Sequence, residues 1–228
     1  MKAMILAAGL GTRMRPLTDE LPKPLLQVGG KALIEYHIIN LAKAGITDIV
    51  INHFHLGEKL EAALGDGSHY GVSIAYSRET TRLETAGGIV KALPLLGSES
   101  FALISADIWT DYDYANLRPV DGEATLARLV MVKNPQHHQG GDFALTAAGR
   151  LSLASKNADT GLTYSGISVM HPKLFANLAE EPLALRPVLD KAIAANLIAG
   201  EMHEGLWFDI GTPERLAELD IYQREVLS

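Results

Sequence analysis

A cluster of basic residues follows the first apolar segment of the chain. Gly9-Leu-Gly11 begins this stretch, and Arg13, Arg15 and Lys23 follow it among three prolines. Glycine lets the backbone approach a ligand closely, and successive N–H groups can form a concave anion site. A guanidinium offers a planar fork of donors that suits phosphate, and an ammonium offers a compact charge. These residue types therefore predict a loop that holds a phosphate-bearing molecule.

Two familiar glycine motifs do not describe this loop. A dinucleotide fingerprint needs a third glycine where this chain has Met14, and Pro16 follows shortly after. The P-loop pattern G-x-x-x-x-G-K-[ST] occurs nowhere in the chain. A wide surface turn would explain Gly-x-Gly alone. However, Pro22 and Pro24 restrict the backbone around Lys23, which lowers the entropic cost of aiming that side chain.

Three segments together resemble the signature of the sugar-1-phosphate nucleotidyltransferases. Gly9-Leu-Gly-Thr-Arg13, Pro16-Leu-Thr18 and Pro22-Lys-Pro-Leu25 match G-x-G-T-R-x-x-P-x-T…P-K-P with the same spacing. The likeness continues through Thr85-Ala-Gly-Gly88, Asp107 and Trp207-Phe-Asp-Ile-Gly-Thr-Pro213, so it covers essentially the whole chain. The segment 164–172 is most similar to members that join UTP to N-acetylmuramate 1-phosphate.

The resemblance implies an enzyme that makes a nucleoside-diphosphate sugar and pyrophosphate. The sugar phosphate oxygen that attacks the α-phosphorus is already an anion, so positioning and electrostatics should supply most of the rate. Arg13 and Lys23 are the implied catalytic residues: Arg13 for the triphosphate, and Lys23 for the α-phosphate and the sugar phosphate. The implied nucleotide site comprises Gly9, Gly11, Thr12, Arg13, Lys23, Gly87, Gly88 and Ser105.

Two parts of the implied nucleotide site leave alternatives open. The family places the base against the backbone of Gly87 or Gly88, but Thr85 could instead cap a helix that begins with a tight turn. Ser105-Ala106-Asp107 stands where Asn-Gly-Asp is more usual in the family. This departure puts one neighbouring amide contact in doubt.

The implied sugar-phosphate site lies in the second half of the chain. Its candidates are Asp142, Lys156, Thr163 and Gly166. Family members commonly carry Glu-Lys where this chain has Ser155-Lys156, so a carboxylate for a sugar hydroxyl is missing. Asp142 could take that role, or it could be a solvated turn residue.

Asp107 and Asp209 are the candidate metal ligands. Asp107 follows a predicted strand at 101–104, and Asp209 has apolar neighbours on both sides, which indicates a partly buried carboxylate. A buried carboxylate needs a cation or several donors. Two carboxylates with phosphate oxygens would suit Mg²⁺, so we expect the two residues to share one magnesium ion. Alternatively, Asp209 caps the turn at Gly211-Thr212 or the helix that starts at Pro213.

These residues need a scaffold of alternating strands and helices. The first half predicts strands at 2–8, 48–52, 72–76 and 101–104, and helices at 33–42, 56–64 and 86–93. The second half predicts strands at 125–132, 143–146, 151–154 and 165–170, helices at 183–196 and 213–226, and a strand pair near 199–209. This order favours an α/β, Rossmann-like nucleotide-diphospho-sugar transferase fold, with a mixed, mostly parallel central sheet flanked by helices. In such sheets ligands bind beyond the carboxyl ends of the strands.

Composition limits the remaining possibilities. The chain has 228 residues, a net charge of −7 and no cysteine, which argues against general nucleic-acid binding, disulfides and thiolate metal sites. No apolar run approaches a membrane span and no signal peptide is visible. We expect a cytoplasmic monomer or small homo-oligomer that binds UTP and a sugar 1-phosphate, with no nucleic-acid or membrane partner. Residues 1–228 should form a single domain without a C-terminal β-helix.

Two other functions are compatible with the sequence. The first is a mannose- or glucose-1-phosphate nucleotidyltransferase that uses GTP or dTTP. The second is a catalytically silent regulatory domain that binds nucleotide sugars. Retention of Arg13, Lys23, Asp107 and Asp209 together argues against the silent domain.

Overall fold

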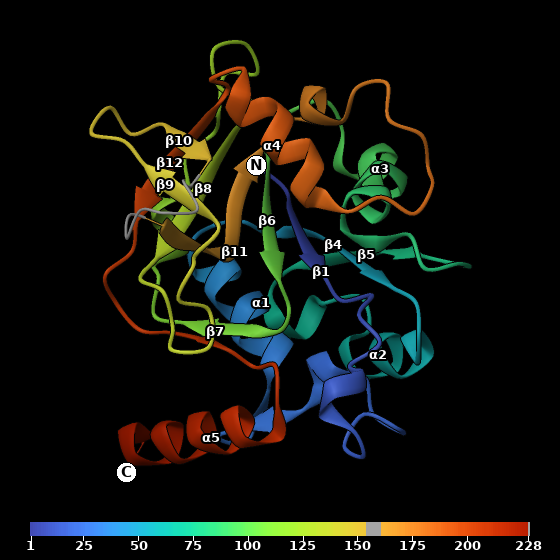
Figure 1. Ribbon diagram of the computed structural model, residues 1–228. Coiled ribbons are helices and arrows are strands. Elements are labelled where there is room, and N and C mark those ends of the chain that lie inside the picture. Colours follow the sequence, from blue (N-terminus) through green and yellow to red (C-terminus); the bar gives the residue numbers. More distant parts are fainter. Residues whose placement is uncertain (154–160, 228) are drawn as a thin grey trace. The chain divides into compact units, whose positions relative to one another are not determined.

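The computed structural model describes residues 1–153 and 161–227 (Figure 1). Its chain divides into two compact units. The terminal unit comprises Lys2–Arg82, Ile104–Asn116 and Leu206–Ser228, and the central unit comprises Leu83–Leu103 and Leu117–Gly205 with Met1. The expectation of a single domain stays a prediction.

A parallel sheet forms the centre of the terminal unit. Strands β1 (Ala3–Leu6), β4 (Asp48–His53) and β5 (Ser73–Arg78) pair in parallel, and β6 (Phe101–Ser105) precedes β1 in the strand order. β1 and the middle of β4 (49–51) are buried apolar runs with little polar alternation, as is typical of strands in a parallel sheet. Helices α1 (Leu33–Lys43) and α2 (Gly57–Leu64) connect consecutive strands of this sheet.

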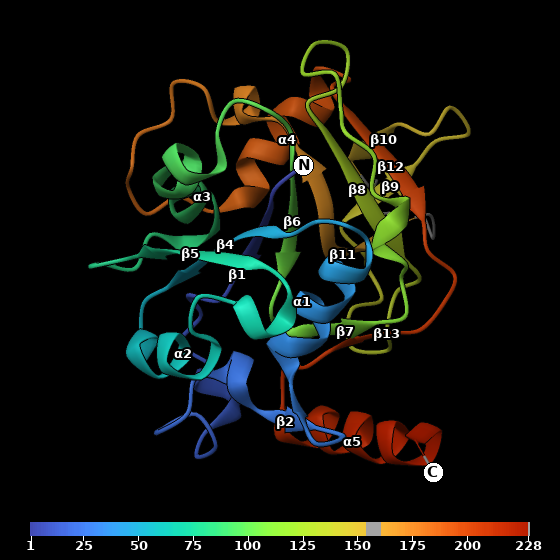
Figure 2. The same cartoon turned by 180° about the vertical axis from the view of Figure 1, so that it is seen from behind.

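A second layer of short elements completes the terminal unit. Strand β13 (Trp207–Asp209) pairs antiparallel with β7 (Ile108–Thr110), and β2 (Gln27–Val28) pairs with β3 (Lys31–Ala32). Helix α5 (Pro213–Leu227) lies beside β2 in Figures 1 and 2. Their shared core consists of Met14, Leu26, Val28, Leu33, Ile210 and Leu219. This core joins the loop after β1 to the segment that carries Asp209.

The central unit is a mixed sheet with two helices. Its strands are β8 (Ala127–Val132), β9 (Phe143–Leu145), β10 (Leu151–Leu153), β11 (Gly161–Met170) and β12 (Ile198–Met202). The order is β10-β9-β11-β6, while β8 pairs antiparallel with β11 and parallel with β12. Helices α3 (Glu84–Leu96) and α4 (Leu185–Ala194) lie side by side.

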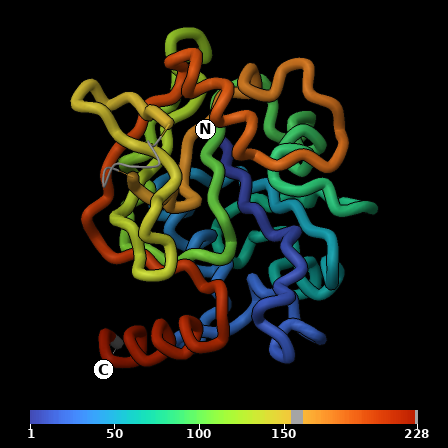
Figure 3. The backbone as a smooth tube through the Cα atoms, viewed as in Figure 1, coloured from blue at the N-terminus to red at the C-terminus, as the bar shows by residue number. Residues whose placement is uncertain are grey.

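Five short 3₁₀ turns occur among the described residues. They are Thr12–Met14, Lys23–Leu25, Ser68–Tyr70, Tyr114–Asn116 and Pro172–Phe175. The chain path between these turns and the strands can be followed in Figure 3. Two of them lie in the loop after β1, where they replace a continuous helix and leave room for its prolines.

The predicted fold class is confirmed, with a mixed, mostly parallel sheet and flanking helices. The predicted strand pair near 199–209 is wrong, because β12 pairs with β8 and β13 pairs with β7. The His203 N–H donates to the Met131 carbonyl at 2.8 Å, whereas Leu206 already bonds Asp111. The residue types of two short apolar segments, here β12 and β13, do not indicate which strand each will pair with. Strand β7, three residues long, was not predicted.

Candidate active site

The glycine loop has a defined backbone around Gly11. Gly11 has a φ of +62°, and a Cβ there would lie 3.0 Å from Thr18 Cγ2. Thr18 Oγ1 donates a hydrogen bond to the Gly11 carbonyl at 2.8 Å. Thr12–Met14 then forms a 3₁₀ turn in which Met14 is buried and Arg13 is exposed. The buried Met14 side chain thus anchors the turn, and the Arg13 side chain on its other side stays exposed.

Asn52 ties the start of this loop to the neighbouring strands. Its Oδ1 accepts the Ala7 N–H at 3.0 Å, and its Nδ2 donates to Glu79 Oε1 at 2.7 Å. Asn52 and Glu79 are both buried, so this polar network is well shielded from water. Sequence reasoning missed Asn52, although a polar residue at the end of an apolar strand is a usable signal.

Lys23 and Asp107 form an ion pair at the end of β6. Lys23 Nζ lies 2.7 Å from Asp107 Oδ2, and the side chains are 10% and 47% exposed. The Ala106 N–H donates to the Leu6 carbonyl at 3.1 Å, which holds the turn after Ser105 against β1. The structure therefore brings the loop lysine to the aspartate predicted as a metal ligand. Contact of Lys23 with phosphate stays a prediction.

The pairing of β7 with β13 brings Asp209 close to Asp107. Asp209 is the register partner of Ile108, and the Ile210 N–H donates to the Asp107 carbonyl at 2.8 Å. The Asp209 carboxylate is ion-paired with Arg215. Thr212 Oγ1 accepts the Arg215 N–H at 3.4 Å, so Thr212 caps α5 as predicted. The helix cap is therefore Thr212 and not Asp209, while the alternative that Asp209 caps the turn at Gly211-Thr212 stays open.

Arg13 approaches Arg215, the partner of Asp209, at Gly211. A Cβ at Gly211 would lie 2.6 Å from Arg215 Nη2 and 3.4 Å from Arg13 Nη1. Both guanidinium groups therefore pack over the bare Cα of Gly211, two residues from Asp209. Arg13, Lys23, Asp107 and Asp209, predicted from four separate motifs, all belong to the terminal unit.

The two aspartates fit a magnesium site. Asp107 directly precedes β7, Asp209 ends the paired strand β13, and each carboxylate is ion-paired with a side-chain cation. The described residues contain no group of three His, Cys, Asp or Glu side chains that could hold a metal. Mg²⁺ commonly takes one or two carboxylates and completes its shell with water and substrate phosphates. The donor set therefore suits a dication that arrives with a nucleotide.

His37 holds the start of β7, the strand that directly follows Asp107. It is buried on α1, where its Nε2 bonds the Ile108 carbonyl at 2.9 Å and its Nδ1 bonds the Tyr114 hydroxyl at 2.7 Å. Because a carbonyl only accepts, Nε2 carries the proton and Nδ1 accepts from tyrosine. Burial lowers the pKa of His37 to about 4, while the Ile108 carbonyl and nearby Asp107 partly oppose that shift. Sequence reasoning missed this buried, neutral histidine and its hydrogen bond to β7.

Gly87 and Gly88 are the fourth and fifth residues of α3, within the central unit. The helix begins at Glu84 and Leu83 is its N-cap position, so the alternative of Thr85 as the cap is wrong. The Gly87 N–H donates to the Leu183 carbonyl at 3.2 Å, and a Cβ at Gly87 would lie 2.1 Å from the Glu181 carbonyl oxygen. Close packing thus already requires glycine at 87. Contact with a base stays a prediction.

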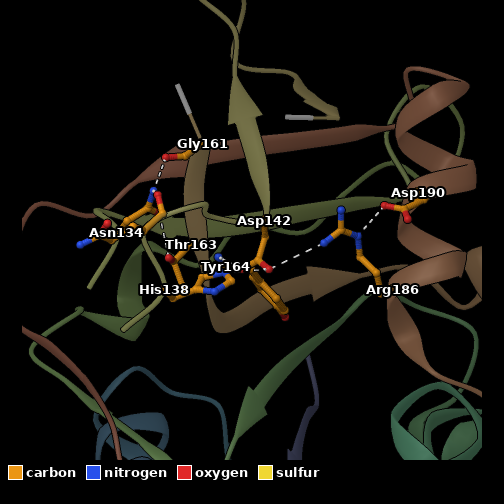
Figure 4. Close-up of polar contacts among 9 residues, drawn as sticks. Asn134, His138, Asp142, Gly161, Thr163, Tyr164, Arg186 and Asp190 are labelled. Atoms are coloured by element: carbon orange, nitrogen blue, oxygen red, sulfur yellow. Dashed lines mark hydrogen bonds and ion pairs between the residues drawn. The ribbon is translucent and has the colours of Figure 1, made fainter. Parts of the chain in front are cut away.

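Asp142 is held by a polar cluster (Figure 4). Its Oδ2 accepts the Tyr164 N–H at 2.9 Å, and its Oδ1 lies 3.3 Å from His138 Nε2. Arg186 Nη1 lies 3.7 Å from the same Oδ1, and Arg186 also donates to Asp190 at 2.7 Å. Asp142 is therefore an oriented, half-buried carboxylate, which argues against the solvated turn.

Thr163 belongs to the neighbouring part of the same sheet. Its hydroxyl donates to Asn134 Oδ1 at 2.9 Å, and Asn134 Nδ2 donates to the Gly161 carbonyl at 2.8 Å. Gly166 has a φ of +84° within the irregular pairing between Tyr164 and Ser168. Lys156 lies outside the described residues. Asn134, His138 and Arg186 are members of this region that the sequence did not single out.

The fold and these charged residues define a nucleotidyltransferase: the chain belongs to the nucleotidyl transferase family, whose model matches residues 2–143. This confirms the resemblance seen in its motifs. The chain is 49% identical over 226 residues to an N-acetylmuramate alpha-1-phosphate uridylyltransferase of Neisseria meningitidis, covering 96% of both chains. It is 34% identical to a Caulobacter vibrioides protein of the same name, covering 93% of this chain and 92% of that one.

More distant similarities share the fold. A mannose-1-phosphate guanyltransferase of Aspergillus fumigatus is 30% identical over 94% of this chain and 62% of its own length. A crystal structure from Bacillus anthracis, assigned as a glucose-1-phosphate thymidylyltransferase, superposes with a TM-score of 0.84 at 22% identity, covering 99% of this chain and 96% of that one. Among the described residues, no helix has the length and apolarity needed to cross a bilayer.

Proposed function

We propose that the protein joins UTP and N-acetyl-α-muramate 1-phosphate to give UDP-N-acetylmuramate and pyrophosphate. The observation that carries the reaction is the meeting of Arg13, Lys23, Asp107 and Asp209, two cations and two carboxylates suited to a metal–triphosphate. The substrates are inferred from the two uridylyltransferase relatives, which match nearly the full chain.

The chemistry requires no general base, since the attacking phosphate oxygen is already charged. Mg²⁺ held by Asp107 and Asp209 would neutralise negative charge on the α-phosphate. Arg13 would bind the triphosphate and the departing pyrophosphate, and Lys23 would orient the α-phosphate toward the sugar phosphate. The N–H groups from Gly9 to Thr12 would cradle the triphosphate. The rest of the proposed nucleotide site is Gly87, Gly88 and Ser105.

The acceptor contacts are proposed in the central unit. Asp142 is already oriented by the Tyr164 N–H, His138 and Arg186, so its carboxylate can accept a sugar hydroxyl with little reorganisation. Thr163 and Gly166 are further candidates. We also propose that the enzyme acts in the cytoplasm on cell-wall sugar recovered for reuse, that is, in peptidoglycan recycling.

One experiment tests the reaction and its substrates. The pure protein is incubated with UTP, GTP, ATP or dTTP and with N-acetylmuramate, mannose or glucose 1-phosphate, and pyrophosphate release is measured with Mg²⁺ or with EDTA. We expect UTP with N-acetylmuramate 1-phosphate to be the best pair, and EDTA to abolish release until Mg²⁺ is restored. A preference for GTP with mannose 1-phosphate would assign the protein to the guanylyltransferases, to which it is also related. No release with any pair would favour a silent binding domain.

A further inference from the structure

Arg215 has no role in the motifs that define the site, yet it contacts the proposed metal carboxylate. It lies in the first turn of α5, where its Nη1 is ion-paired with Asp209 Oδ2. The Arg215 side chain is only 20% exposed. Its Nη2 reaches the bare Cα face of Gly211, the same face that Arg13 approaches.

The position of these two arginines is electrostatically unusual. Nitrogen atoms of both guanidinium groups lie within 3.4 Å of the position that a Gly211 Cβ would occupy. Like charges so close repel, and Asp209 can offset only one of them. Lys23 is paired with Asp107, and the five side chains of Arg13, Lys23, Asp107, Asp209 and Arg215 together carry three positive and two negative charges. An anion at this place would relieve the repulsion.

We propose that Arg215 is a polyphosphate ligand that Asp209 holds in reserve until a dication takes the carboxylate. With the Asp209 carboxylate bound to Mg²⁺, Arg215 would lose its ion-pair partner, and its guanidinium would turn to phosphate oxygens beside Arg13. A planar guanidinium suits this transfer, because the same fork that grips a carboxylate also grips a phosphate. This inference rests on the proposed function for the metal and the triphosphate.

Gly211 is the residue that makes the exchange possible. A Cβ at this position would lie 2.6 Å from Arg215 Nη2, so even alanine would displace that guanidinium. Its bare Cα leaves space for two guanidinium groups to lie together and for one of them to rotate.

The test measures binding of inorganic tripolyphosphate by calorimetry, first in EDTA. Without metal, wild-type Asp209 competes with the ligand for Arg215, whereas Asp209→Asn releases the guanidinium. We expect Asp209→Asn to bind tripolyphosphate about tenfold more tightly than wild type. The double variant Asp209→Asn/Arg215→Gln should lose that gain. With Mg²⁺ present, Arg215→Gln should bind about tenfold more weakly than wild type, and Arg215→Lys should restore part of the affinity.

Arg224→Gln is the matched control, because Arg224 is also on α5 and pairs with Asp220 at 2.8 Å. It should bind tripolyphosphate as wild type does in both conditions. If the gain in Asp209→Asn persists in the double variant, removal of a negative charge alone explains it and Arg215 is not a ligand. Unchanged binding by Asp209→Asn in EDTA would equally overturn the proposal. Tripolyphosphate carries neither base nor sugar, so a wrong substrate assignment would alter pyrophosphate release but not this result.

Discussion

The polar groups of the two units are bonded in different ways. In the terminal unit, charged side chains bind one another, as Lys23 binds Asp107 and Arg215 binds Asp209. In the central unit, Asp142 and Asn134 also bind the main chain, through the Tyr164 N–H and the Gly161 carbonyl, and Asp142 contacts His138 and Arg186 in addition. Ion pairs can exchange partners when a metal or phosphate arrives, whereas bonds to strand backbone persist as long as the sheet does.

This difference indicates two ways to prepare a site. Under the proposed function, pairs of opposite charge would keep the cations and carboxylates compensated until a magnesium–triphosphate arrives. Backbone-anchored side chains instead keep a fixed arrangement, which suits a neutral, shape-dependent partner such as a sugar ring. Substitutions should therefore change turnover in the terminal unit and substrate affinity in the central unit.

The largest effect is expected for Lys23→Ala. Loss of a positioned charge on a transferring phosphate should lower kcat/KM by roughly 10²–10³-fold, by analogy with other electrostatic contributors to catalysis. Stability should fall by about 1–2 kcal/mol, because the buried stem of Lys23 is lost, whereas the half-exposed Asp107 carboxylate left behind can be hydrated. Steady-state kinetics and urea denaturation measure the two effects. The exposed Lys43→Ala is the control, and near-normal turnover of Lys23→Ala would remove that lysine from the mechanism.

An effect of intermediate size is expected for the loss of folding stability in acid, through the buried His37. Its folded-state pKa of about 4 lies below the ordinary value of 6.5, so the unfolded chain takes up the proton first as the pH falls. The contribution of neutral His37 is thus complete above pH 6.5 and is lost toward pH 4, amounting to about 2 kcal/mol less stability by pH 5.

Urea denaturation at pH 8 and pH 5 measures this loss, with His37→Gln and the exposed His55→Gln compared with wild type. The pH-dependent loss should shrink by about 2 kcal/mol in His37→Gln and persist in His55→Gln. An equal loss in all three proteins would show that other groups control the acid response of the fold.

The smallest effect is expected for Asp142→Asn. The amide keeps an oxygen for the Tyr164 N–H but loses the charge that orients His138 and Arg186. We expect the KM for the sugar phosphate to rise about fivefold to tenfold, as for one charge-assisted hydrogen bond, with the KM for UTP unchanged. A drop in kcat with both KM values unchanged would contradict the division between the two units.

Local sequence pattern was sufficient for the loop backbone, one helix start and several buried strands. Gly11 needs a left-handed backbone, and prolines flank Lys23, so the loop motif could be recognised from residue types and spacing alone. Thr212 before Pro213 predicted the start of α5. The apolar runs of β1, β4 and β6 predicted the buried strands of the sheet. These features depend on neighbours within a few residues, which the sequence displays directly.

Partners from distant segments were decided only by the tertiary structure. Asp107 meets Lys23 across 84 positions, and Ala7 meets Asn52 across 45. The partner of β13 was predicted wrongly for the same reason, since any strand edge can satisfy a short apolar run. Arg215 looks like an ordinary helix residue until folding places its guanidinium between Asp209 and the bare face of Gly211. Charge and burial depend on which segments pack together, and no local pattern specifies that.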